Sequence, residues 1–355
     1  MPTDADVAFN SLMRAYLEAL LTRTWLSRGP LSWVLLPVAV VYALISAIHR
    51  WWFRRGPGNV GRAGIPVIVV GNVIAGGAGK TPLVMALVQH LKSRGLAVGI
   101  VSRGHGRASR HVEMVQDNAT AQDVGDEPLL LARRCQVPVA VGSRRLQAIQ
   151  ALRRAHPALQ VVVSDDGLQH HAMHHDVALC VFDDRGLGNG WPLPAGPLRE
   201  PWPRVLPENS TQFVVATDRA NMPGAYVVQR ALARQAINGR GQTRPLSDWR
   251  DQTVTALAGI ARPQSFFDML QAQGVRPRTL PLPDHADTAL LAQTLAQLPR
   301  HQDVLCTEKD AVKLWPQHPD VWAVPLELKL PEVLMSDIDR ALDPKLSSPH
   351  GQQTA

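Results

Sequence analysis

The alternation of apolar and polar stretches predicts two successive α/β units. Short runs rich in valine and isoleucine alternate with segments in which apolar residues recur every three or four positions, a pattern typical of buried parallel strands separated by helices. In the first unit the predicted strands are Ile65–Val70, Leu96–Ser102, Val137–Val141, Val161–Ser164, Val177–Phe182 and Phe213–Thr217. In the second they are Val254–Ile260, Arg278–Leu282, Asp303–Thr307 and Val321–Leu326, and Pro331–Leu342 is the last predicted helix.

The same pattern divides the chain into five parts. We expect an N-terminal amphipathic and hydrophobic segment (1–55), a core formed by the first α/β unit (56–225), a linker or pair of edge strands (226–250), a C-terminal α/β domain (251–342) and a disordered tail (343–355). The polar, arginine-rich composition of 226–250 and the polar composition of the tail mark the last boundaries.

The N-terminal segment combines two kinds of helix. Residues 10–26 place their leucines on one face and predict an amphipathic helix, whereas Leu31–Ile48 is almost wholly apolar and is followed by tryptophans and arginines. An 18-residue run is at the short end of what spans a bilayer. It could span the membrane, lie in its interface with the tryptophans and arginines as anchors, or form a buried core helix. The first two readings together favour membrane attachment.

The strongest chemical signal is the stretch directly after the first predicted strand. A glycine-rich turn leads into Lys80-Thr81 and then a helical pattern, the order that builds a phosphate-binding P-loop. The residues expected to surround a nucleotide are Ile74, Ala75, Gly76, Gly77, Ala78, Gly79, Lys80 and Thr81. The match is imperfect, because Ile74 stands where the usual motif has glycine. The fold expected is therefore a P-loop NTPase-like, mostly parallel sheet with helices on both faces, followed by the smaller α/β domain.

A second signal lies at the end of the strand that begins at Val161. Two adjacent carboxylates, Asp165 and Asp166, follow the apolar run, and such a pair is costly without a compensating cation. P-loop enzymes hold Mg²⁺ at this position together with the P-loop hydroxyl, here Thr81. ATP and Mg²⁺ are the expected cofactors.

Other polar groups stand at strand ends with weaker signals. Arg103 lies among glycines, and Arg199 lies in a long Pro/Gly-rich loop, so that either could contact phosphate. Asp126 could be a helix cap or a catalytic group, and a histidine beside aspartates, His285, is by itself more often a surface pair. Four histidines between His170 and His175 could bind metal, but no cysteine or further ligand pair lies nearby, and we treat them as peripheral.

The net charge of the chain limits the classes of binding partner to be expected. Lysine and arginine number 37 against 30 aspartates and glutamates, which gives +7 and points to an anionic partner. Because aromatic residues are few and basic repeats are lacking, a membrane surface or a phosphorylated substrate is expected, and nucleic acid is not. Three widely separated cysteines indicate neither a disulfide framework nor a zinc site.

Seven motifs taken in order make the chain resemble one family. They are GNxxxGGxGKTP (Gly71–Pro82), SRGHGR (Ser102–Arg107), VGDEP (Val124–Pro128), SDDGLQH (Ser164–His170), PAGPLRE (Pro194–Glu200), PDH (Pro283–His285) and TEKDAVK (Thr307–Lys313). This series is similar to that of the tetraacyldisaccharide 4'-kinases, the lipid A kinases of Gram-negative bacteria, whose loop also lacks a glycine at the position of Ile74. The departures are His105, where tyrosine is common, and the histidine-rich run.

The resemblance implies transfer of the γ-phosphate of ATP to the 4'-hydroxyl of an acylated glucosamine disaccharide 1-phosphate, giving lipid IVA at the cytoplasmic face of the inner membrane. It further implies Asp126 as the base with His285 tuning or sharing that role, Lys80 on the phosphates, and substrate contacts from Arg103, Gln169 and Arg199. A monomer is expected. Two alternatives stay open: a kinase of another lipid or sugar, and a P-loop GTPase that reads guanine through Thr307–Asp310, which resembles an N/T-K-x-D motif.

Overall fold

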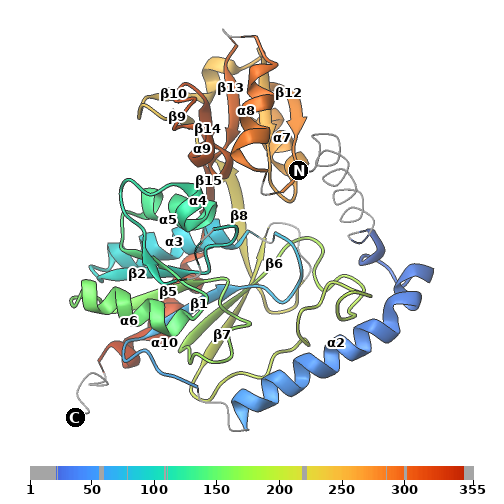
Figure 1. Ribbon diagram of the computed structural model, residues 1–355, viewed down its shortest axis with the longest axis vertical. Coiled ribbons are helices and arrows are strands. Elements are labelled where there is room, and N and C mark those ends of the chain that lie inside the picture. Colours follow the sequence, from blue (N-terminus) through green and yellow to red (C-terminus); the bar gives the residue numbers. More distant parts are fainter. Residues whose placement is uncertain are drawn as a thin grey trace.

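The computed structural model describes residues 21, 23–55, 60–77, 79–107, 109, 111–217, 222–284, 286–299 and 302–347. Most of the helix expected over 10–26 lies outside these residues, as do Ala78, His285 and the tail from 348 onward. Figure 1 shows two α/β units, one above the other, with a long helix along the outer side of the lower unit.

Within the described residues the first unit contains a nine-stranded sheet with the strand order β15-β8-β7-β6-β1-β5-β2-β4-β3. Its parallel centre is β1 (Val67–Gly71) between β5 (Val161–Asp165) and β6 (Val177–Phe182), extended by β2 (Val98–Ser102), β4 (Val139–Val141), β7 (Thr211–Thr217) and β8 (Tyr226–Leu232). Two antiparallel strands close the edges, β3 (Glu113–Met114) and β15 (Leu326–Lys329). The central strands are buried along their whole length, as continuous β-branched runs require.

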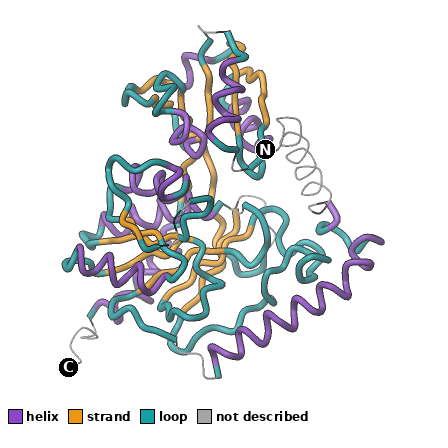
Figure 2. The backbone as a smooth tube through the Cα atoms, viewed as in Figure 1, coloured by secondary structure: helices purple, strands orange, loops and turns teal. Residues whose placement is uncertain are grey.

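Helices flank this sheet (Figure 2). They are α3 (Lys80–Ser93), α4 (Ala121–Val124), α5 (Asp126–Cys135), α6 (Arg145–Ala155) and α10 (Glu332–Leu346). Leu83, Leu87 and Leu91 recur on the buried face of α3, which packs on β1 and its neighbours. This packing fixes the start of α3 above the carboxyl end of β1, so the position of the phosphate-binding turn follows from burial of one helix face.

The second unit is a six-stranded sheet with the order β10-β9-β14-β13-β11-β12 in the part of the chain that the structure describes. Its strands are β9 (Gln235–Asn238), β10 (Thr243–Pro245), β11 (Thr253–Ala258), β12 (Arg276–Pro281), β13 (Val304–Thr307) and β14 (Trp322–Val324). The helices are η1 (Leu246–Trp249), α7 (Pro263–Ala272), α8 (Thr288–Ala296) and α9 (Glu308–Leu314). Trp249, Phe267 and Leu270 fill its core.

The structure departs from the sequence-based elements near the C-terminus. The single strand expected over Val321–Leu326 is two strands, because Pro325 has no N–H for a ladder hydrogen bond and the chain leaves one sheet for the other there. β14 belongs to the second sheet and β15 to the first. The last helix also differs from the division at 251–342: α10 runs through Leu346 and buries Leu334 in the core of the first unit.

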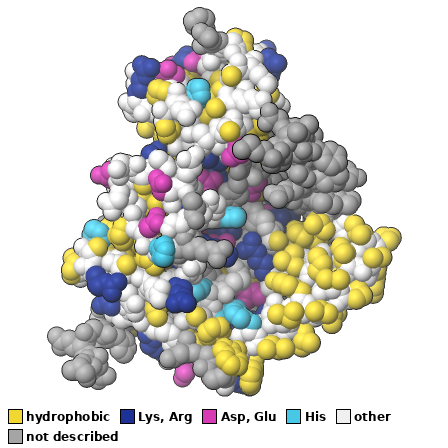
Figure 3. Space-filling view, in the orientation of Figure 1, with side chains coloured by type: hydrophobic (Ala, Val, Ile, Leu, Met, Phe, Trp, Pro, Cys, Tyr) yellow, Lys and Arg dark blue, Asp and Glu magenta, His cyan; other side chains and the backbone are white. Residues whose placement is uncertain are grey.

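Helix α2 (Pro30–Arg54) leaves most of its side chains exposed or half-buried. It contains the whole apolar run expected over Leu31–Ile48 and is the one helix among the described residues that is long and apolar enough to cross a membrane. Only Ser32 and Ala39 are buried, so the reading of α2 as a core helix is wrong. The apolar side chains of α2 form the broad hydrophobic surface in Figure 3.

The packing of α3 leads to a stability prediction. Leu87→Ala removes a fully buried side chain and leaves a cavity under the sheet, so the free energy of unfolding falls by about 2–5 kcal/mol. Gln89→Ala, on the exposed face of the same helix, changes it by no more than about 0.5 kcal/mol. Urea unfolding followed by circular dichroism measures both, and equal effects would contradict the assigned helix face.

Candidate functional site

The turn between β1 and α3 has the backbone that a phosphate cradle needs. Gly76 and Gly79 have φ values of 93° and 79°, a left-handed region that side chains with a Cβ disfavour. Gly79 is the N-cap of α3, so Lys80 and Thr81 occupy its first two positions. The positive end of the helix dipole and its unpaired N–H groups therefore face the same region as the Lys80 ammonium.

Asn72 ties the turn together. Its side-chain amide donates to the Gly76 carbonyl (3.1 Å), and its Oδ1 accepts a hydrogen bond from Lys80 Nζ (3.3 Å). Asn72 is fully buried, so these bonds replace contacts with water. The sequence analysis did not single out this residue, although a polar side chain directly after a buried strand was a usable signal.

A second segment braces the turn from outside. Ile74 forms an antiparallel bridge with Leu198, the Ala75 N–H donates to the Pro197 carbonyl (2.8 Å), and the Arg199 N–H donates to Val73 (2.7 Å). The Ile74 side chain is fully buried. The isoleucine in place of the usual glycine is therefore part of a packed bridge, and the Ala75 N–H is already used within the protein.

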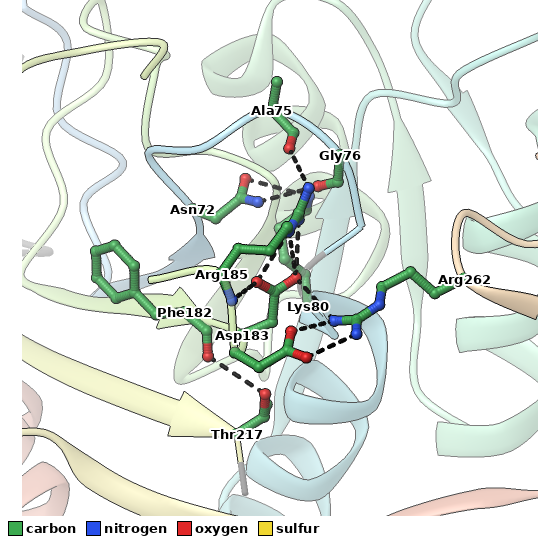
Figure 4. A network of polar contacts seen from close by, with 10 residues as sticks. Asn72, Ala75, Gly76, Lys80, Phe182, Asp183, Arg185, Thr217 and Arg262 are labelled. Carbon is green, nitrogen blue, oxygen red and sulfur yellow. Dashed lines mark hydrogen bonds and ion pairs between the residues drawn. The ribbon is translucent and has the colours of Figure 1, made fainter. Parts of the chain in front are cut away.

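Arg185 also contacts the turn (Figure 4). Its guanidinium donates to both carboxylate oxygens of the buried Asp183 and, at 3.2 Å, to the carbonyl of Ala75. Arg262, from the second unit, pairs with Asp184 (2.7 Å) and lies 3.7 Å from Asp183. These arginines, which the sequence analysis missed, connect the phosphate-binding turn to the second unit.

Asp165 and Asp166 end β5 beside the start of α3. Asp165 is buried, and its Oδ2 accepts a hydrogen bond from Ser102 Oγ (3.3 Å), while its Oδ1 has no hydrogen-bond partner among the described residues. Asp166 has a left-handed backbone (φ 48°), and its Oδ1 lies 3.6 Å from Lys80 Nζ. The start of α3 and the residue directly after β5 thus bring an ammonium and a carboxylate together.

Burial raises the pKa of Asp165 to about 7. The carboxylates of Glu127 and Asp166 act in the same direction, and the cationic groups of Lys80 and Arg145 oppose them. An orphaned carboxylate oxygen beside a second carboxylate and a hydroxyl is a donor set that suits a hard, oxygen-preferring cation. These residues therefore fit Mg²⁺.

Arginines gather around the two aspartates at the carboxyl ends of neighbouring strands. Arg145, at the start of α6, is buried, donates to the Gly142 carbonyl (2.7 Å), and has its pKa lowered to about 10 by burial. Arg107 has one buried guanidinium nitrogen without a hydrogen-bond partner in the described part of the chain, and Arg103 is exposed. The sequence analysis named Arg103 as a candidate and did not name Arg145, whose place at a helix start gave no distinct signal.

Two predicted substrate-contacting residues have partners inside the protein. Gln169 donates through Nε2 to the Asn72 carbonyl and to Glu200 Oε1, both at 2.9 Å. Arg199 lies 3.6 Å from Asp166 Oδ2 and remains partly exposed. Gln169 thus supports the backbone of the phosphate-binding turn at Asn72, whereas the Arg199 guanidinium lies beside the Asp166 carboxylate.

Of the four histidines between His170 and His175, the first two are half-buried and the last two are buried. Burial lowers the pKa of His170 to about 4, of His171 to about 3 and of His175 to about 4, and nearby arginines add to each shift. Among the described residues no group of three His, Cys, Asp or Glu side chains is placed to hold a metal.

Asp126 begins α5, directly after Gly125, and is buried. Its Oδ1 accepts a hydrogen bond from the Glu127 N–H (3.0 Å), and its Oδ2 lies 3.6 Å from Lys313 Nζ and 4.0 Å from Lys309 Nζ. Both lysines belong to α9 of the second unit. Its proposed companion His285 lies outside the described residues.

The guanine-reading alternative fails on the geometry of Asp310. Its carboxylate is fully buried and accepts hydrogen bonds from the Gly259 N–H (2.9 Å) and the Thr307 hydroxyl (2.7 Å). A guanine-specific aspartate must instead present both oxygens to the base. Thr307–Asp310 is therefore the start of a structural helix.

A phosphate cradle whose lysine meets strand-end carboxylates on a mostly parallel sheet defines a P-loop phosphotransferase. The profile of one such family, tetraacyldisaccharide-1-P 4'-kinase, matches residues 31–343. The chain belongs to this family and is a kinase with an alcohol acceptor.

Individual relatives support the same family assignment. The chain is 47% identical over 325 residues to the tetraacyldisaccharide 4'-kinase of Delftia acidovorans. This alignment covers 91% of this chain and 94% of that protein. It is 46% identical over 329 residues to that of Acidovorax sp. strain JS42, with 92% and 95% covered. The crystal structure of LpxK from Aquifex aeolicus in complex with ATP superposes with a TM-score of 0.74 at 27% identity, over 88% of this chain and 99% of that one.

Proposed function

We propose that this protein transfers the γ-phosphate of ATP to the 4'-hydroxyl of tetraacyldisaccharide 1-phosphate, which yields lipid IVA. The observation that carries the proposal is the segment around Leu198 and Arg199, which contacts both the phosphate-binding turn and the exposed apolar helix α2. A kinase for a water-soluble sugar has no need of that connection. Every group that the proposal uses comes from one chain, and we propose that it acts as a monomer.

In this proposal the nucleotide phosphates bind at the start of α3. Lys80 would neutralise the β- and γ-phosphates, and the amides from Gly76 through Gly79 would surround them. The assignment starts at Gly76 because the Ala75 N–H already donates to Pro197. The Aquifex aeolicus protein, solved with ATP, supports ATP as the donor.

We assign Mg²⁺ to Asp165 and Asp166 together with the Thr81 hydroxyl. When bound, the ion would neutralise charge on the phosphate oxygens. The orphaned Oδ1 of Asp165 and the neighbouring Ser102 hydroxyl support this assignment.

We assign Asp126 as the base, in the role that the family resemblance implies. It would accept the proton of the 4'-hydroxyl as that oxygen attacks the γ-phosphorus and the bond to ADP breaks, with His285 sharing or tuning the proton transfer. Phosphoryl transfer depends mainly on positioning and charge neutralisation. Arg103 and Arg199 would hold the anionic lipid substrate. Gln169 would support the site indirectly, through its hydrogen bond to the Asn72 carbonyl.

The membrane contact is assigned to α2. Trp33 packs edge-to-face on Trp191 (4.8 Å between ring centroids), Tyr42 donates to the Arg199 carbonyl (3.0 Å), and His49 lies beside His171. These contacts extend along most of the helix, so a spanning helix would draw polar parts of the kinase into the hydrocarbon region, at a high energetic cost. We therefore propose that α2 lies in the membrane interface, at the cytoplasmic face of the inner membrane where ATP is available.

Loss of either central group should nearly abolish turnover. Lys80→Ala and Asp126→Asn each lower kcat about 10²–10³-fold, because each removes a group that acts in the transition state. The assay follows ³²P transfer from ATP to the disaccharide 1-phosphate in detergent, and Lys329→Ala, on an exposed position of an edge strand, should match the parent. Parent-like turnover of Lys80→Ala would exclude the P-loop assignment.

Magnesium binding should depend on pH. Because the pKa of Asp165 is raised to about 7, the carboxyl holds a proton below that pH, and Mg²⁺ must displace it. Mg²⁺ affinity therefore weakens as pH falls below about 7, by up to tenfold per unit for one displaced proton. Calorimetric titration on either side of pH 7 measures this, with Asp165→Asn as the variant that loses binding at both. An affinity independent of pH would contradict the assignment.

Charge on α2 should release the protein from membranes. Val34→Glu combined with Ile45→Glu places carboxylates on the exposed apolar face, so the fraction that floats with phosphatidylglycerol-containing vesicles falls sharply while ATP binding is kept. Val333→Glu, the same change at an exposed position of α10, is the matched control. Equal flotation of both variants would show that α2 is not the membrane contact.

A further inference from the structure

The motif Thr307–Lys313 has no part in the mechanism above, yet its charged side chains are buried. It forms α9, in which Glu308, Asp310 and Lys313 are all less than a tenth exposed. Burying three ionisable groups on a seven-residue helix is costly unless each has a partner. The partners therefore indicate what the helix does.

Asp310 fixes α9 to the second sheet. It accepts hydrogen bonds from the Thr307 hydroxyl, at the helix cap, and from the Gly259 N–H at the end of β11. A Cβ at Gly259 would lie 2.8 Å from Asp310 Oδ1, so the approach requires glycine. This anchor holds the remaining side chains of α9 in a constant position.

The other two charged groups face the first unit at opposite ends of α5. Glu308 pairs with Arg134, at the C-terminal end of α5 (2.9 Å), and Lys313 lies against Asp126 at its N-terminal end (3.6 Å). Val312 packs between them in a cluster with Leu129. The two helices thus run antiparallel, with one ion pair at each end.

Asp126 lies in a strongly charged environment. Among the described residues, Lys313 and Lys309 face it from α9. Lys309 also pairs with Glu127 and Asp284, and Lys313 Nζ lies 4.0 Å from Asp310 Oδ1. Lys313 Nζ also donates to the Ala286 carbonyl (2.8 Å), which holds the ammonium in place. Burial disfavours the charged form of Lys309, but Glu127, Asp284 and Asp126 outweigh it and raise the pKa of Lys309. Lys309 therefore stays cationic at neutral pH.

We propose that Lys313, with Lys309 beside it, is a positioning residue that keeps the carboxylate of Asp126 ionised and oriented to accept a proton. The inference rests on the proposed role of Asp126 as the base. A buried carboxylate must either take up a proton or face a cation, and α9 supplies the cation from the other unit. A protonated Asp126 could not accept the proton of the sugar hydroxyl.

The test is the pH profile of kcat/KM for Lys313→Met, which keeps the length of the side chain and removes its charge. Without the cation, Asp126 holds its proton to higher pH, so the acidic limb moves up by about one pH unit or more. Activity returns on the alkaline side, and the KM for ATP stays near that of the parent. Lys313→Arg, which restores the charge, should recover the parent profile.

Three comparisons make the result decisive. Arg134→Met removes the ion pair at the other end of the same helices and should lower activity equally at all pH values, as a purely structural contact does. Lys309→Met, whose ammonium is farther from Asp126, should shift the limb in the same direction by less, and it replaces Lys313→Met if that variant does not fold. A Lys313→Met profile that overlays the parent overturns the inference, whereas an active Asp126→Asn would instead overturn the proposed base.

Discussion

The antiparallel bridge between the phosphate-binding turn and the segment that contains Leu198 is the contact on which the rest of the site depends. A glycine-rich turn has little side-chain packing of its own, so its shape must be imposed from outside. Here Ile74 supplies a buried side chain, its two neighbours in the chain supply backbone hydrogen bonds to that segment, and Asn72 closes the turn from within. The isoleucine that weakens the match to the usual motif is what attaches this turn to its support.

The same support joins two environments that a lipid kinase must bring together. Tyr42 of α2 donates to the carbonyl of Arg199, whose N–H bonds the turn at Val73 and whose guanidinium faces Asp166. One residue therefore lies between the apolar helix and the proposed metal site. In the proposed function, a substrate with its acyl chains in the membrane presents its sugar to the phosphates without leaving the bilayer, because hydrogen bonds to the backbone of Arg199 connect the helix to the turn.

Sequence reasoning succeeded for features that a short stretch of the sequence determines. A continuous β-branched run indicates a buried parallel strand, and the residues directly after such a strand lie at the carboxyl edge of the sheet. Lys80 and Asp166, each singled out from its own motif, therefore lie side by side there. It failed where the information is non-local. No periodicity shows that Pro325 moves the chain from one sheet to the other, that Gln169 bonds the backbone of Asn72, or that the short helix carrying Lys313 packs against Asp126.

The buried carboxylates at this edge of the sheet show how charge compensation separates roles. Asp183 is fully paired by the guanidinium of Arg185, a closed arrangement that suits structure rather than chemistry. Asp126 faces ammonium groups that belong to the other unit, so its ionisation depends on how the two units are joined. Asp165 keeps an oxygen without a hydrogen-bond partner in the described part of the chain and has a raised pKa, the state expected of a ligand that is completed by a cation. Three buried carboxylates with three different kinds of partner thus support a structural role for Asp183 and the proposed roles of Asp126 as base and Asp165 as metal ligand, a distinction that motif matching alone does not make.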